Sequence, residues 1–176
     1  MSDKTPNDSA SAPLRVVGTV RVVDFESRWR GEFARLNIEW LERWFTVEPV
    51  DREVLGDPQT HLLADGGRVL FAVDEADQVL GTVALKRYED GLVELTKMAV
   101  EPSLRGGGIG RKLMAGAIEA FQQMDGRELF LESSTRLGPA LKLYESVGFR
   151  HRPAPRPGSH YQRADVYMVW EFGASA

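Results

Sequence analysis

A glycine-rich stretch, Arg105-Gly106-Gly107-Gly108-Ile109-Gly110-Arg111-Lys112, follows an apolar segment and precedes a helical pattern that begins at Ile109. Glycine lets the backbone take positive φ and approach a ligand closely, because it has no Cβ. The first amides of a helix have no intrahelical acceptor, and the helix dipole adds roughly half a positive charge there. The stretch therefore predicts a loop whose backbone amides bind a phosphate or pyrophosphate.

The spacing of the glycines excludes two common phosphate-binding loops. A P-loop, G-x-x-x-x-G-K-S/T, needs glycine where Arg111 stands. A dinucleotide loop, G-x-G-x-x-G, places Arg111 or Leu113 at its third glycine. The pattern that fits is R/Q-x-x-G-x-G/A, filled by Arg105, Gly108 and Gly110. On its own, this short pattern is more typical of a capping turn between a strand and a helix.

Two further segments give the loop a context. Glu94 to Pro102 reads ELTKMAVEP, an apolar strand that ends in hydrophobic-x-Val-x-Pro, and Ala140 to Phe149 reads ALKLYESVGF. In this order, the strand, the loop and the A-x-x-L-Y-x-x-x-G-F segment resemble the GNAT superfamily of N-acetyltransferases. The resemblance covers Val69 to Val169, whereas Leu14 to Leu63 shares only a strand followed by helices.

The resemblance implies a mixed α/β fold, in which helices flank a mostly antiparallel sheet and two central strands splay apart to hold acetyl-CoA. Loop amides would hold the pyrophosphate, and Arg105 would close the loop. Main-chain groups of the central strand would hold the pantetheine arm, with an N–H near Met98 directed at the thioester oxygen. The implied cofactor-binding residues are Met98, Ala99, Val100, Arg105, Gly106, Gly107, Gly108, Ile109, Gly110, Arg111, Pro139 and Tyr144.

Direct acetyl transfer to an amine requires no Ser or Cys nucleophile, since positioning alone can supply roughly 7 to 11 kcal/mol. By the resemblance, Tyr144 stands where the departing thiolate is protonated, and a phenol pKa of about 10 suits that transfer. The alternative is a tyrosine that packs on the sheet. Glu94 and Glu132 are candidate bases, because a partly buried carboxylate with a raised pKa can relay the amine proton. We favour Glu94, although either residue could equally be exposed or ion-paired.

The chain departs from the family pattern three residues before Ala140, where many relatives carry asparagine and this sequence has Leu137. A contact to the cofactor arm is then either missing or supplied by Ser134 or Thr135. Pro139 suits the first turn of the helix that follows.

A proline-rich segment, Pro153 to Arg163, is expected to form a loop at the edge of the sheet. With Arg152 just before it, the segment carries Arg156 and Arg163, and guanidinium groups bind carboxylates bidentately. We therefore expect an acceptor amine that also carries a carboxylate, such as an amino acid or a short peptide. A solvated loop without a ligand is the alternative.

Strand and helix patterns place these groups on one mixed sheet. A hairpin is expected from Val69–Val73 and Val79–Leu85, followed by a strand at Leu92–Val100, a helix from Ile109 to Met124 and a short strand at Leu129–Leu131. A helix over Leu137–Ser146 and a strand over Val166–Phe172 complete the pattern, and Asp51 to Gly67 is expected to be a loop with a short helix. Near the N-terminus, a strand over Leu14–Val23 precedes one or two helices. Their apolar stripe predicts a core face or the wall of an acceptor pocket, and consists of Phe25, Trp29, Phe33, Leu36, Trp40 and Trp44.

Composition narrows the classes of function. The chain has 176 residues, a formal net charge of -4 and no cysteine, which argues against nucleic acid binding, disulfides and thiolate chemistry. Its three histidines form no metal-binding pattern, and it has no long apolar run that would indicate a membrane span. We expect a flexible tail at 1–13 and one domain at 14–176 in a cytoplasmic protein. The protein could be a monomer or a homodimer.

The sequence thus predicts an N-acetyltransferase that transfers an acetyl group from acetyl-CoA directly to a primary amine of a small molecule, amino acid or peptide. The alternative is a non-catalytic module that binds CoA as a sensor or as part of an assembly. We expect no metal, nucleic acid or membrane partner.

Overall fold

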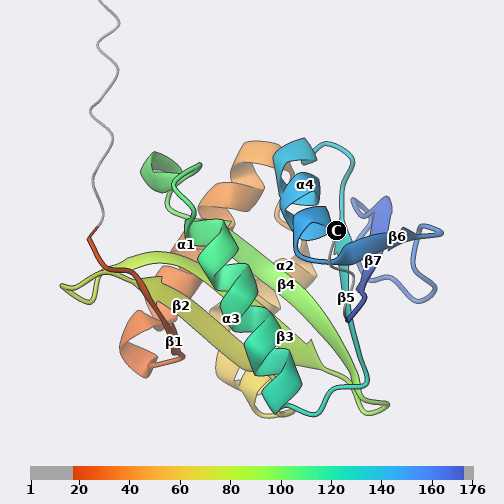
Figure 1. Cartoon of the computed structure of the whole chain (residues 1–176), viewed down its shortest axis with the longest axis horizontal. Helices are drawn as coiled ribbons and strands as arrows, with labels where there is room; N and C mark the ends of the chain where they lie inside the picture. The colour runs from red at the N-terminus through yellow and green to blue at the C-terminus, as the bar shows by residue number, and fades with distance from the viewer. Residues whose placement is uncertain (1–17, 173–176) are drawn as a thin grey trace, which may run out of the picture.

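A seven-stranded sheet in the order β1-β2-β3-β4-β5-β7-β6 organises the computed structural model, which describes residues 18–172 (Figure 1). All neighbouring strands are antiparallel except β4 and β5, which are parallel. The strands are β1 Arg21–Asp24, β2 Arg68–Val73, β3 Val79–Arg87, β4 Leu92–Val100, β5 Glu128–Ser133, β6 Phe149–Arg152 and β7 Val166–Trp170. The helices are α1 Arg30–Trp44, α2 Pro49–Gly56, α3 Ile109–Gln123 and α4 Gly138–Ser146. The predicted mixed, mostly antiparallel sheet with flanking helices is confirmed.

Helices cover both faces of this sheet. α3 crosses one face along β2, β3 and β4, while α1 packs on the other face (Figure 1). Leu113, Met114 and Ala117 of α3 are completely buried, as the helical spacing of its apolar residues predicts. Phe33 and Leu36 of α1 are buried in a second cluster on the opposite face.

The aromatic stripe before and within α1 lies partly in the core and partly along a cleft. Its first half, Trp29 to Leu36, lies in the core, and Trp29 packs on Phe71 of β2 with ring centroids 5.5 Å apart. Trp40, farther along the helix, is only partly buried and lines a cleft, whereas Trp44 is 40% exposed. The helix is therefore anchored at its start and contributes to the cleft at its end.

The parallel strands β4 and β5 separate after a short paired region. Their pairing runs from Leu92 opposite Glu128 to Glu94 opposite Phe130, although β4 continues to Val100. A bulge lies just beyond: Ala84 pairs with Thr96 and Thr82 with Ala99, so that two residues of β4 face one of β3. One of the two, Lys97, has φ of 51°, which is unusual for a residue with a Cβ. The bulge bends β4, and the splay that the resemblance implied is confirmed.

Most predicted elements lie where the sequence placed them. The β2–β3 hairpin and β4 match their predicted ranges closely, and the aromatic segment forms one α-helix after a 3₁₀ turn at Ser27–Trp29. Asp51 to Gly67 is more helical than expected, because α2 is followed by a π-helical turn at Gln59–Leu63. The predicted first strand is shorter in the described part, where it begins at Arg21. Its start and the predicted tail at 1–13 lie outside the described residues.

Candidate functional site

The glycine loop has the backbone geometry that the sequence predicted. Gly106 and Gly108 have φ of 83° and 87°, and Gly108 is the N-cap of α3 without a side-chain capping bond. A Cβ built on either glycine would meet nothing within 4 Å, so both face open space. Lys112 N donates to Gly108 O at 3.1 Å, which leaves the N–H groups of the preceding first turn directed out of the helix. The loop can thus present backbone donors to an anion.

Arg105 has a structural role at the start of this loop. Its Nε donates to Val100 O at 3.2 Å, and its Nη2 lies 2.9 Å from Glu39 Oε2 of α1. The guanidinium therefore fastens the end of β4 to α1. Arg111, in the first turn of α3, donates to Ser146 Oγ at 3.3 Å and so links α3 to the end of α4.

A cleft of about 710 Å³, counted with its solvent-open space, lies where β4 and β5 separate. Its floor comes from the two strands, and α1, α4 and the loop between β6 and β7 supply its walls. The cleft contains four charged side chains and several aromatic ones. The residues that matter below are Trp40, Leu41, Phe45, Glu94, Lys97, Met98, Leu131, Glu132, Ser134, Leu137, Tyr144, Tyr161 and Arg163.

Glu94 and Glu132 both line the cleft, from neighbouring strands. Glu94 is 3% exposed, and its Oε2 accepts a hydrogen bond from the Tyr88 hydroxyl at 2.8 Å. Burial raises the pKa of Glu94; the bond from Tyr88 lowers it in part, and the nearby Glu132 carboxylate raises it further. Glu132 differs in one respect, because its Oε1 is buried without a hydrogen-bond partner.

Tyr144 of α4 lines the same cleft and packs edge-on against Phe149, with ring centroids 6.1 Å apart. Burial raises the pKa of its phenol to about 12. Tyr144 therefore keeps its proton at neutral pH, as an acid must before it donates.

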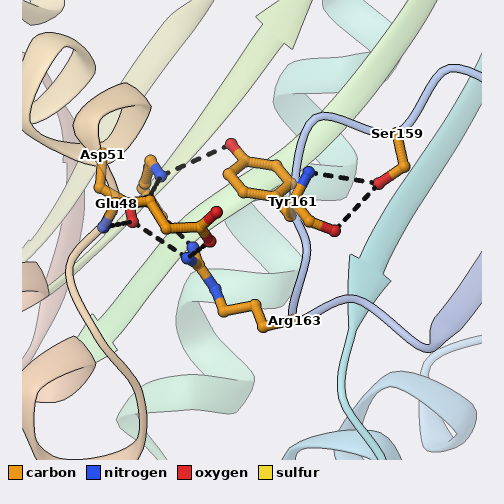
Figure 2. Close-up of polar contacts among 6 residues, drawn as sticks. Glu48, Asp51, Ser159, Tyr161 and Arg163 are labelled. Carbon is orange, nitrogen blue, oxygen red and sulfur yellow. Dashed lines mark hydrogen bonds and ion pairs between the residues drawn. The ribbon is translucent and has the colours of Figure 1, made fainter.

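A buried charge cluster that the sequence analysis did not anticipate closes one side of the cleft (Figure 2). Arg163 Nη2 and Lys97 Nζ lie 2.9 and 2.7 Å from Asp51 Oδ1, and Arg163 Nη1 also bonds Glu48. Figure 2 shows Arg163 reaching from its loop toward both acidic residues. Burial raises the pKa of Asp51, but the bonds from Arg163 and Lys97 outweigh that effect and lower it to about 2. Asp51 therefore remains a carboxylate that neutralises these cations.

The arginines predicted to gather at the acceptor do not lie together. Arg152 is on the edge strand β6 and pairs with Glu171 at 2.8 Å, away from the cleft lining, so the prediction is wrong for this residue. Arg156 stacks on Phe130, 4.1 Å from the ring centroid. Only Arg163 lines the cleft, and two carboxylates already bind it.

The remaining predicted cofactor-binding residues take clear positions. Met98 lines the cleft, while Ala99 and Val100 pair with Thr82 and Gly81 of β3 along the end of β4. Pro139 lies in the first turn of α4, as predicted. Near Leu137, Ser134 is buried in the cleft wall, whereas the Thr135 hydroxyl donates to Asp165 Oδ2 at 2.8 Å. Many relatives carry an asparagine where this chain has Leu137, and Ser134 and Thr135 were the candidates to replace its contact. Of these two residues, Ser134 is the one that lines the cleft.

Comparison with known proteins identifies the family. A family model described as an acetyltransferase (GNAT) domain matches residues 65–151. An uncharacterized N-acetyltransferase of Schizosaccharomyces pombe is 30% identical over 134 residues, which are 70% of this chain and 82% of the relative. The chain belongs to the GNAT acetyltransferase family.

Other GNAT relatives match shorter parts. Mycothiol acetyltransferase of Actinosynnema mirum is 33% identical over 86 residues, 49% of this chain but only 28% of the relative. The uncharacterized N-acetyltransferase YjgM of Escherichia coli is 33% identical over 88 residues, 48% of this chain and 53% of the relative. The chain thus spans about half or less of these two proteins.

Solved structures of GNAT proteins share the fold. An acetyltransferase of the GNAT family from Staphylococcus aureus has a TM-score of 0.77 at 18% identity, and the match covers 86% of this chain and 98% of that structure. An acetyltransferase from Streptococcus agalactiae has a TM-score of 0.71 at 18% identity, covering 86% and 97%.

Two kinds of feature are absent from residues 18–172. Among these residues, no group of three or more His, Cys, Asp or Glu side chains could hold a metal ion. In the same part of the chain, no helix is both long and apolar enough to cross a membrane.

Proposed function

We propose that this GNAT protein is an acetyl-CoA-dependent N-acetyltransferase that transfers the acetyl group directly to a primary amine. The observation that carries the proposal is that β4 separates from β5 beyond Glu94. The separation lies between the glycine loop and a cleft that is lined by both Glu94 and Tyr144. This arrangement supports a cofactor groove beside one acid candidate and one base candidate.

The residues fit the proposed cosubstrate. Gly106 and Gly108 have positive φ and open space beside them, so their backbone can approach a pyrophosphate at the start of α3. β4 from Leu95 to Val100 lies beyond its pairing with β5, which leaves a strand edge where the main chain of Met98 and Val100 can hold an extended arm. Acetyl-CoA would supply an acetyl group already activated as a thioester.

Glu94 and Tyr144 suit the two proton transfers. Glu94, with its raised pKa, would take one proton from the bound ammonium, directly or through water, and pass it to solvent. The amine nitrogen then forms the new bond to the acetyl carbon as the bond from carbon to sulfur breaks. The Tyr144 hydroxyl gives its proton to the sulfur and regains one from the acylated nitrogen. One proton is released in total.

The names of relatives leave the acceptor open. One relative is named for mycothiol, and others, such as the human protein at 31% identity over 108 residues, are named N-acetylaspartate synthetase. These names refer to different acceptors, so the acceptor of this chain has to be inferred from its own cleft.

A thiol-release assay tests the proposal. Purified full-length protein is mixed with acetyl-CoA and a panel of primary amines, and free CoA is measured together with the acetylated amine. We expect thiol release that depends on both amine and enzyme. A non-catalytic CoA-binding module would bind acetyl-CoA in a calorimeter but release no thiol with any amine, and that result would refute the enzymatic proposal.

A further inference from the structure

The two cationic side chains of the cleft already form ion pairs with carboxylates of the protein itself. Arg163 binds Asp51 through two hydrogen bonds of 2.9 and 3.0 Å and also binds Glu48, while Lys97 Nζ lies 2.7 Å from Asp51. Asp51 is completely buried, so water does not compete for these bonds. A carboxylate on the acceptor would have to displace Asp51 or Glu48 from the same groups.

One anionic atom of the cleft, in contrast, has no partner. Glu132 Oε1 is buried without a hydrogen bond, although Glu132 lines the cleft. A buried acceptor atom without a donor is costly, and a charged donor makes the strongest bond to a carboxylate. Glu94 offers less, because one of its oxygens already accepts from Tyr88. Glu132 is therefore the group to which an incoming ammonium would bind.

One part of the wall is apolar. Trp40, Leu41 and Phe45 line the cleft from the end of α1 and the residue after it, and Leu131 and Leu137 line it from β5 and the turn before α4. Trp40 and Phe45 pack together with ring centroids 5.9 Å apart. This wall suits an apolar body attached to the amine.

We propose that the acceptor is a primary amine with an apolar body and no carboxylate, and that Glu132 binds its ammonium group. The proposal rests on the proposed function and assigns the substrate class of that site. An α-carboxylate lies two bonds from the amine nitrogen, so it would come close to Glu132 and Glu94 and be repelled by them. The inference reverses the expectation, drawn from the arginines in the sequence, that amino acids or peptides are preferred.

Matched pairs of substrates test the class in the unaltered protein. The value of kcat/KM is measured at pH 7, where the amine of each compound is largely protonated, for phenethylamine against phenylalanine and for tryptamine against tryptophan. We expect each amine to exceed its amino acid by about ten to a hundredfold, because the carboxylate of the amino acid would lie close to the carboxylates of Glu132 and Glu94. An equal or greater value for the amino acids would overturn the inference while leaving an N-acetyltransferase in place.

A variant tests the role of Glu132. In Glu132→Gln, we expect the Kd of phenethylamine for the CoA-bound protein to weaken about tenfold or more by calorimetry, and the preference over phenylalanine to shrink. Glu119→Gln is the control, since Glu119 is exposed on α3 and bonds Gln123. Unchanged phenethylamine affinity in Glu132→Gln would refute the assignment of Glu132.

The same measurements separate the two levels of the argument. If the protein acetylates amino acids but not the matched amines, the inferred substrate class is refuted and the N-acetyltransferase activity stands. Acetyl-CoA binding without acetylation of any amine in the panel refutes the proposed function, and the substrate class falls with it.

Discussion

Lys97 Nζ lies 2.7 Å from Asp51 Oδ1, and this pair joins the bulge of β4 to helix α2. Both side chains are buried, and Arg163 joins them from the loop between β6 and β7 (Figure 2). Breaking a buried pair by removing one partner leaves an uncompensated charge, which is strongly destabilising. The cluster therefore fixes three segments that together shape the cleft.

Asp51 makes the stability of the protein depend on pH in the acid range. Its pKa is lowered from 3.8 to about 2, so it binds protons more weakly in the fold than in the unfolded chain. The stabilisation is complete above the unfolded pKa and is lost as pH falls from about 4 toward 2. Linkage gives about 2 kcal/mol for this contribution. Urea unfolding of the parent and Asp51→Asn at pH 6, 4 and 2.5 measures it.

The difference in the free energy of unfolding between the two proteins should change with pH. Asp51→Asn should be less stable than the parent at pH 6, and the gap should narrow at pH 2.5, where Asp51 of the parent binds a proton in the unfolded chain and unfolding is thereby favoured. Asp90→Asn, in the turn before β4, is a control on an exposed carboxylate. A gap that does not change with pH would show that Asp51 acts through packing alone.

Acetyl-CoA binding should depend on the backbone of Gly108. Valine strongly disfavours φ of 87°, and a Cβ there would project into the space where the loop meets its ligand. In Gly108→Val, we expect acetyl-CoA affinity to fall at least about tenfold by calorimetric titration while circular dichroism still shows a folded protein. Gly31→Val, on the exposed start of α1, controls for the change in residue type. Unchanged affinity in Gly108→Val would remove the loop from the cofactor site.

Tyr144→Phe should lower kcat by about 10²-fold or more and leave acetyl-CoA affinity nearly unchanged. Phenylalanine keeps the ring packed on Phe149 but removes the proton that the raised pKa of about 12 retains. Tyr167→Phe is the matched control, because Tyr167 packs on Phe130 and lies outside the residues that line the cleft. If Tyr144→Phe turned over as fast as the parent, the tyrosine would be packing only.

The parts of the site predicted from sequence are those built from consecutive residues. β4, the glycine loop and the start of α3 follow one another, so glycine spacing and apolar alternation were enough to locate them. The Asp51, Lys97 and Arg163 cluster joins residues 46 and 112 positions apart, and no local pattern encodes such pairing. One signal was present: a lysine inside a largely apolar strand requires a partner if it is buried.

The arginine-rich loop shows the opposite error. Arg152 and Arg163 are close in sequence, yet Arg152 pairs with Glu171 on the edge of the sheet and Arg163 reaches α2. Proximity along the chain does not place side chains together where the backbone leaves one strand and returns in another. The carboxylates that occupy Arg163 lie more than a hundred positions away, so the sequence offered no sign that this cation was already neutralised.

The pH dependence of catalysis should identify Glu94 as the base. An ionised Glu94 is needed to accept a proton from the bound ammonium, so kcat/KM should fall as pH falls through its raised pKa. Glu94→Gln should remove this limb and reduce the rate by about 10²- to 10⁴-fold. Two neighbours should move the limb in opposite directions. Tyr88→Phe deletes the hydrogen bond that favours the ionised form and should shift the limb to higher pH, whereas Glu132→Gln deletes a like charge and should shift it lower. A limb that stays in place in both variants would mean that another group is the base.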